Sequence, residues 1–157
     1  MCSWKVIILE RENKVREAIS LEKASHTQKY VRMNTSYVEV SVDWEKVANE
    51  IKRTEEWFQE VQSASEGYLY ATLEEFTNPS RLHTFCQKIM SYLGITRADM
   101  RKCIDAYERA SEIFPKQDSG KLCETVKNFR EGEIALQAAR ASEEAMQSYQ
   151  QVSKECR

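Results

Sequence analysis

The two histidines are the first residues to test for chemistry, because imidazole is the side chain that most readily transfers protons near neutral pH. His26 follows Glu22 by four residues, which places both on one face of a helix; one such pair is typical of a solvated polar contact and not of a metal site. His83 precedes Cys86 by three residues, a spacing at which a base could activate a thiol. The sequence offers no third group to orient that base, so we expect no nucleophilic catalysis.

Sequence motifs for phosphate, dinucleotide, hydrolase and metalloprotease chemistry are absent. No G-x-x-x-x-G-K-S/T, G-x-G-x-x-G, G-x-S-x-G or H-E-x-x-H stretch occurs. A di-metal helical bundle needs paired Glu-x-x-His units, and neither histidine has a Glu three residues before it. We therefore predict that the protein is not an enzyme and that it holds no metal and no cofactor.

The spacing of the five cysteines favours free thiols. None belongs to a C-x-x-C pair, and with only two histidines as partners a structural zinc site is not expected. Cys86, Cys103 and Cys123 fall on apolar helical positions and are most simply small buried hydrophobes. We therefore predict reduced thiols and a cytoplasmic protein.

The apolar runs are too short for a membrane span or a signal peptide. Residues 6–9, VIIL, are followed by a charge, whereas a span needs about 18 apolar residues and a signal-peptide core about 7–15. A mature secreted chain whose signal peptide is removed would look the same, and it would pair four of its five cysteines. The tripeptide NTS at Asn34 matches a glycosylation acceptor, which matters only in that case.

Composition and charge indicate one globular domain over residues 1–157, with 1–42 the less certain part. The net charge of −2 gives no overall attraction for phosphates, so we expect no nucleic acid partner. The charge is uneven, however: residues 39–75 carry ten acidic and three basic side chains, and residues 79–116 carry seven basic and four acidic ones. Either neighbouring helices attract each other, or an acidic face binds a basic partner.

Apolar residues at steps of three and four predict about five helices. The first covers residues 3–25, although KVIIL alone could be a strand. Residues 26–42 are ambiguous: YVEVSV alternates like a strand, but with no partner strand expected, a helix or an extended linker fits better. The clearest apolar stripe runs from Trp44 to Thr72, and its first turn can be capped by Ser41 or Asp43.

The later helices are delimited by residues that begin or end helices. Asn78 and Pro79 begin the third and Gly94 follows its end, while Thr96 begins the fourth and Pro115 ends it. Residues 119–156 would span roughly 57 Å as one helix, so we expect either an elongated bundle or a break at Gly132, and a kink at Gly67 by the same argument. The fold class predicted is all-α, an antiparallel helical bundle.

One stretch resembles a known family of helical repeats. Cys103, Tyr107, Ala110 and Pro115 have the spacing of the second helix of a tetratricopeptide repeat, with a partial echo at Ala145, Tyr149 and Val152. The resemblance implies stacked helix pairs that bind a peptide in a concave groove. A plain helical bundle is the alternative, because small and aromatic residues at these spacings suit any close-packed antiparallel pair.

A binding surface on the acidic helix is the functional prediction. Phe58 belongs to the apolar stripe, so its neighbour Trp57 lies beside or outside it and could form an exposed patch with Tyr70; the alternative is that Trp57 contacts the first helix. We predict a non-catalytic interaction module, an adaptor or assembly subunit, which binds a protein with a basic surface. The alternative is a secreted four-helix signalling protein with disulfides. The residues expected to bind the partner are Trp57, Tyr70, Glu55, Glu56 and Glu60.

Overall fold

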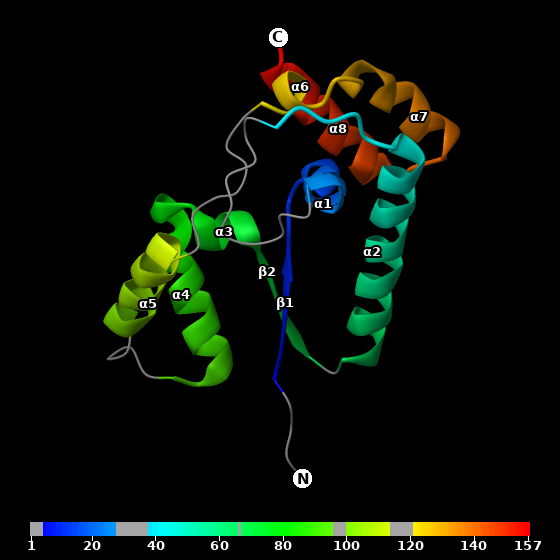
Figure 1. The fold of residues 1–157 in the computed structure, drawn as a ribbon. Coiled ribbons are helices and arrows are strands. Elements are labelled where there is room, and N and C mark those ends of the chain that lie inside the picture. The colour runs from blue at the N-terminus through cyan, green and yellow to red at the C-terminus, as the bar shows by residue number, and fades with distance from the viewer. Residues whose placement is uncertain (1–4, 28–37, 66, 96–99, 114–120) are drawn as a thin grey trace. The chain divides into compact units, whose positions relative to one another are not determined.

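The computed structural model describes residues 5–27, 38–65, 67–95, 100–113 and 121–157 (Figure 1). Helices contain most of these residues, and the strands among them form a two-stranded parallel sheet. The prediction of a mostly helical, bundle-type fold is therefore confirmed. Several of the expected helices are divided into shorter elements.

The described residues group into two compact units. The first contains residues 1–12 and 59–113, and the second contains residues 13–58 and 114–157. The first holds β1 (Val6–Glu10), β2 (Tyr68–Thr72), α3 (Leu73–Thr77), α4 (Pro79–Leu93) and α5 (Met100–Ile113). The second holds α1 (Lys14–Thr27), α2 (Trp44–Ala64) as far as Phe58, α6 (Leu122–Thr125), the short 3-10 turn η2 (Phe129–Glu131), α7 (Gly132–Ala138) and α8 (Glu143–Glu155). The single-domain prediction stays a prediction.

The sheet of the first unit replaces the ends of two predicted helices. β1 pairs in parallel with β2, with Val6 opposite Tyr68 and Glu10 opposite Thr72. The first predicted helix therefore begins only at Lys14, and the second ends at Ala64. Both strands are rich in β-branched and aromatic residues, which favour extended backbone once a partner strand is available. Gly67 has a φ of 78°, so it makes the turn from α2 into β2 and is not a kink within a helix.

The α4 boundaries follow the sequence prediction. The Asn78 side chain accepts a hydrogen bond from the Ser80 amide, Pro79 occupies the first turn, and Gly94 ends the helix with a φ of 72°. Leu82, Phe85 and Cys86 of α4 form an apolar core against Ala71 of β2. The predicted cap at Thr96 and the predicted stop at Pro115 lie outside the described residues.

An aromatic cluster lies at the centre of the second unit. The Trp44 ring meets Phe129 and Tyr149 edge-on at centroid distances of 6.2 and 5.9 Å. Gly132 is buried beside this cluster, where an added Cβ would lie 2.4 Å from Trp44 and 2.6 Å from Tyr149. Gly132 has helical φ and ψ and begins α7, so the predicted break is not there. The final segment changes direction instead between α6 and η2 and between α7 and α8, where Arg140 has a φ of 54°.

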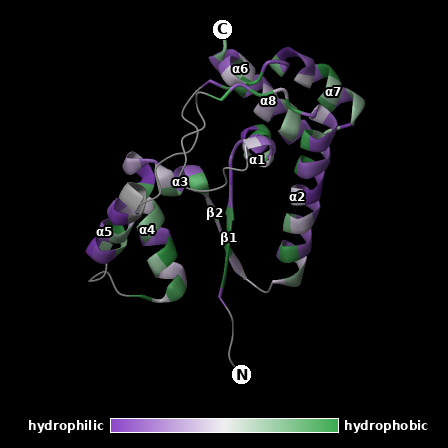
Figure 2. Ribbon diagram, in the orientation of Figure 1, coloured by the Kyte–Doolittle hydropathy of each residue, from purple (hydrophilic) through white to green (hydrophobic). Residues whose placement is uncertain are grey.

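The described part of the ambiguous segment is extended. The Val40 amide donates to the Thr125 carbonyl at 2.8 Å, and the Val40 carbonyl accepts from the Lys127 amide at 2.9 Å, which makes a parallel bridge to Val126. The extended-linker interpretation therefore holds for residues 38–43, whereas Asn34 lies outside the described residues. Along α2, which follows, hydrophilic and hydrophobic residues alternate in short steps, as an amphipathic helix requires (Figure 2).

Two disulfides overturn the prediction of reduced thiols. Cys86 of α4 is bonded to Cys103 of α5, and Cys123 of α6 is bonded to Cys156 after α8, with a Cα–Cα distance of 6.0 Å in each pair. Such bonds form and persist in oxidising compartments and are rare in the cytosol. The predicted cytoplasmic location is therefore wrong. The prediction failed because helix positions that suit small buried hydrophobes can also bring two thiols within bonding distance.

Candidate functional site

The histidines do not build a reactive site in the structure. His26 lies 3.1 Å from the Glu22 carboxylate and is exposed, as expected of a solvated pair. Cys86, the thiol proposed to neighbour His83, is bonded to Cys103 and cannot act as a thiolate. In the described part of the chain, His, Cys, Asp and Glu side chains do not gather in any group of three that could hold a metal ion. Among the described helices, none combines the length and apolar character that a membrane span requires.

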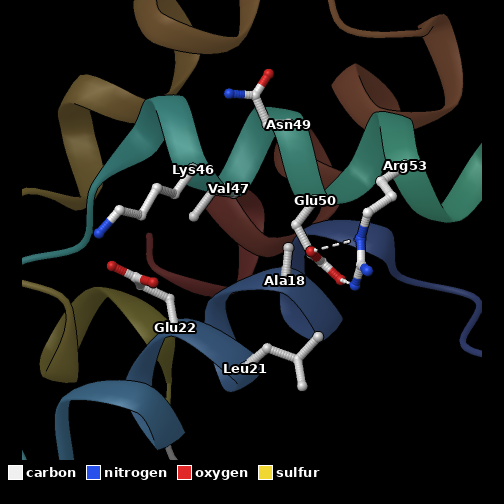
Figure 3. A pocket seen from close by; sticks show the side chains of 8 residues that line it. All are labelled: Ala18, Leu21, Glu22, Lys46, Val47, Asn49, Glu50 and Arg53. Carbon is white, nitrogen blue, oxygen red and sulfur yellow. Dashed lines mark hydrogen bonds and ion pairs between the residues drawn. The ribbon is translucent and has the colours of Figure 1, made fainter.

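A groove with an apolar floor lies between α1 and α2. It encloses about 470 Å³ and lies wholly within the second unit (Figure 3). Its lining side chains are Ala18, Leu21 and Glu22 from α1 and Lys46, Val47, Asn49, Glu50 and Arg53 from α2. Buried alanine and valine form the floor, and Leu21 stands at the edge with 46% of its surface exposed. The groove can therefore receive an apolar side chain between charged walls.

The start of α2 is held by its cap and by its first aromatic residue. The Asp43 carboxylate accepts hydrogen bonds from the amides of Glu45 and Lys46 at 3.1 and 3.2 Å, so the predicted cap is Asp43. The Trp44 indole donates to the Asn128 carbonyl at 3.0 Å. These contacts fix the wall of the groove that carries Lys46, Val47 and Arg53.

The start of α1 is anchored just as firmly. The Asn13 side chain accepts from the Arg16 amide at 2.9 Å and donates to the Ser148 carbonyl of α8 at 3.0 Å. Lys14 lies over the Phe58 ring at 5.2 Å, which ties the first turn of α1 to α2. Because both helices are anchored near the groove, its walls are pre-formed.

The charged wall of the groove is internally paired. Arg53 donates two hydrogen bonds to the Glu50 carboxylate, at 2.7 and 3.1 Å (Figure 3). The hydrogen bond and the charge of Glu50 raise the pKa of Arg53 above its ordinary value, so the guanidinium stays charged. An occupant of the groove would therefore meet an ion pair on α2 beside the apolar floor.

Trp57 continues the same side of α2 beyond the groove. Glu50, Arg53 and Trp57 follow one another at steps of three and four residues, which aligns them along one side of a helix. Trp57 is 55% exposed, and its ring meets Phe58 edge-on at 5.0 Å. Phe58 itself is buried, as its place on the apolar stripe predicted.

Of the predicted acidic residues, Glu60 follows Trp57 by three residues and shares that side of the helix, whereas Glu55 does not. Glu55 accepts a hydrogen bond from the Ser142 hydroxyl at 2.5 Å and is partly buried. Glu56 pairs with Lys52 at 3.8 Å, and Glu60 is exposed one turn beyond Trp57. The acidic run therefore includes one carboxylate that is already used inside the fold.

Tyr70 lies in the first unit, on β2, whereas Trp57 lies in the second. Tyr70 is 38% exposed, and its hydroxyl donates to Glu10 at 2.9 Å. The proposed common patch of Trp57 and Tyr70 stays a prediction, as does the role of all five residues in binding a partner.

Sequence reasoning missed the groove, although the sequence contained one sign of it that was not used. Leu21 lies two residues after Ile19, off the face that carries Val15, Ala18 and Ile19, so an apolar residue directed away from the core was visible in the sequence. The opposite wall could not be found in this way, because it depends on how α1 and α2 pack.

The stretch from Cys103 to Pro115, which resembles a tetratricopeptide helix, contributes Tyr107 to the packing of the first unit. The Tyr107 ring meets Phe76 edge-on at 5.1 Å, and its hydroxyl donates to the Thr77 carbonyl at 3.0 Å. Cys103, the small residue of the pattern, is in the disulfide with Cys86. Pro115 lies outside the described residues, so the tetratricopeptide resemblance stays a prediction.

Comparisons with known proteins identify no relative: no family model, no curated protein and no solved structure matches this chain.

Proposed function

We propose that the protein is a secreted, disulfide-bonded helical signalling protein that acts by binding another protein. The observation that carries this proposal is the pair of disulfides, one in each compact unit. Such bonds are rare in reducing compartments, whereas small secreted domains commonly depend on them.

The lengths of the two closed loops support an oxidising location. Cys86–Cys103 closes a separation of 17 residues, and Cys123–Cys156 closes one of 33 residues. The loop-entropy relation gives about 3 kcal/mol for the first and about 4 kcal/mol for the second. Domains are typically stable by only about 5–15 kcal/mol, so reduction of both bonds would remove a large part of the folding free energy.

The surface proposed to bind the partner is the side of α2 that carries Arg53 and Trp57, together with the adjoining groove. Exposed tryptophan is enriched among the residues that dominate binding energy at interfaces. The groove offers an apolar floor next to Leu21, so the partner should insert an apolar side chain there. Pre-formed walls lower the ordering cost of binding.

A thiol count tests the secreted part of the proposal. The protein is unfolded in denaturant without reductant, after secretion from eukaryotic cells, and its free thiols are titrated. We expect one free thiol of the five cysteines, since four are bonded. Five free thiols would refute the proposal.

A comparison of variants tests the binding surface. Fluorescently labelled protein is added to intact cells of the source species, and saturable binding is measured for the wild type, Trp57→Ala and Leu21→Ala. We expect both variants to weaken binding by tenfold or more, which corresponds to roughly 1.4 kcal/mol. The matched control is Ile134→Ala, which removes an apolar side chain that is 73% exposed on α7. Equal weakening by the control would contradict the assignment.

A further inference from the structure

A second hollow in the second unit has the opposite chemistry from the groove. It encloses about 560 Å³ and is bordered by α6, the η2 turn and the C-terminal end of α8. Figure 1 shows α6 beside the end of α8, and the Cys123–Cys156 disulfide joins these two elements directly. This hollow, which we call the basic pocket, is lined mainly by polar groups.

Cations outnumber carboxylates around the basic pocket, although the whole chain carries a net charge of −2. Lys121, Lys127, Arg130 and Arg157 line it, and the acidic side chains on its wall are Glu124 and Glu131. Lys127 also pairs with Glu39 at 3.6 Å, and both of these side chains are more than 60% exposed. Exposed ion pairs of this kind contribute little, so Lys127 is available to a stronger anionic partner.

The other three cations have no carboxylate of their own in the described part of the chain. Neither Lys121 nor Arg130 nor Arg157 forms an ion pair with any described residue. Like charges gathered around one hollow repel each other, and an anion placed among them relieves that repulsion. The electrostatics of the basic pocket therefore favour binding of an anion.

The backbone that carries these cations is fixed. Asn128, between Lys127 and Arg130, accepts a hydrogen bond from the Val42 amide at 3.0 Å and donates one to the Val42 carbonyl at 2.8 Å. The Tyr149 hydroxyl donates to the Phe129 carbonyl at 2.8 Å. Burial raises the pKa of Tyr149, so this hydroxyl remains a neutral donor. Lys121 and Arg157 each lie within two residues of a half-cystine of the same disulfide.

We infer that the basic pocket binds a sulfated polysaccharide. This inference rests on the proposed secretion, because sulfated polysaccharides are the abundant polyanions outside cells. Guanidinium groups donate paired hydrogen bonds to tetrahedral oxyanions, and lysines add point charges. Cations from three separate segments suit a chain of sulfates better than one small anion, which one or two of them would satisfy. The volume lies within the range of about 300–1,000 Å³ typical of sites for small organic groups, so a sugar unit has room among the charges.

The test uses the full disulfide-bonded chain and a labelled heparin octasaccharide, with fluorescence anisotropy measured at several NaCl concentrations. Wild-type protein should bind it at physiological salt, and the double variant Lys127→Gln/Arg130→Gln should bind about tenfold more weakly or worse. The slope of log affinity against log salt should fall by about two, one for each lost contact. Circular dichroism verifies that each variant is folded.

The matched control is Lys52→Gln/Arg101→Gln, which removes the same charge from exposed helix positions outside the pocket. Equal weakening by this control would overturn the inference, because it would show attraction by net charge alone. Absence of wild-type binding at physiological salt would overturn it too. Equal binding of an oligonucleotide of matched charge, or complete displacement by inorganic sulfate at the same concentration as the octasaccharide, would also overturn it. The thiol count reports separately on secretion, so failure of that proposal and failure of the pocket are distinguishable.

Discussion

Replacement of Trp57 by alanine should leave the protein folded and close to wild-type stability. The Trp57 side chain is 55% exposed, and its ring meets that of Phe58 edge-on at 5.0 Å. An aromatic pair adds about 0.5–1.5 kcal/mol beyond burial, and the higher helix propensity of alanine returns about 0.5 kcal/mol. These two terms leave a loss of about 0–1 kcal/mol, and the buried part of the side chain adds roughly 1 kcal/mol. We therefore expect a total loss of about 1–2 kcal/mol in the free energy of unfolding.

Trp44, on the same helix, provides the matched contrast. It is 5% exposed, its ring contacts Phe129 and Tyr149, and its indole donates to the Asn128 carbonyl. Trp44→Ala should lose about 3–5 kcal/mol, as removal of a buried aromatic side chain does. Urea unfolding at neutral pH with the disulfides intact measures both values by the same transition.

The comparison also decides whether Trp57 is available to a partner. If Trp57→Ala loses as much stability as Trp44→Ala, the Trp57 ring is part of the packed interior, and its assignment to the binding surface is wrong. If the loss is only about 1–2 kcal/mol, the variant stays folded, and its weaker binding cannot be explained by unfolding. The stability measurement must therefore precede the cell-binding assay.

Two further predictions concern single positions. Gly132→Ala should lower the free energy of unfolding in urea by up to about 2 kcal/mol. Overpacking against Trp44 and Tyr149 costs roughly 1–3 kcal/mol, and the gain in helix propensity returns about 1 kcal/mol. A stabilised variant would contradict the close approach. The hydrogen bond from the Thr72 amide, followed by the contact with Lys88, lowers the pKa of Glu75. Its charge therefore stabilises the fold above the unfolded-state pKa of about 4.3, and this contribution is lost as pH falls through the lower folded-state pKa. Glu75→Gln should accordingly be less stable than wild type at pH 7, with the difference disappearing in acid; a difference independent of pH would disprove the role of the charge.

Local chemistry explains which parts of the fold were predictable. The ends of α4 are set by the Asn78 cap, Pro79 in the first turn and the left-handed Gly94, and each acts within a few residues of its own position. The β1–β2 pairing has no such local signal, because a short apolar run such as residues 6–9 suits a strand or a helix until a partner strand is known.

The disulfides and the groove, like the β1–β2 pairing, depend on how distant segments pack and could not be predicted from local sequence. Cysteine spacing alone does not determine connectivity, since the Cys86–Cys103 bond forms only because α4 and α5 lie side by side. The groove needs two walls, and the sequence indicates one of them through the off-face position of Leu21. The other wall follows from the way α1 and α2 are anchored to the core of the second unit.

Not every acidic side chain of α2 is available to a partner, because Glu55 is used inside the fold. Ser142 caps α8, and Glu55 accepts the hydrogen bond of the Ser142 hydroxyl, so this carboxylate lies at the N-terminus of α8. A negative charge there is favoured by the partial positive charge of the helix end. Glu55 is thus held by the fold, on a different side of α2 from Trp57, and its removal should affect stability before it affects binding. The side chains free to select a partner are those that follow the groove, so apolar contact at Leu21 and Trp57, and not the summed acidic charge of the helix, should decide which protein binds.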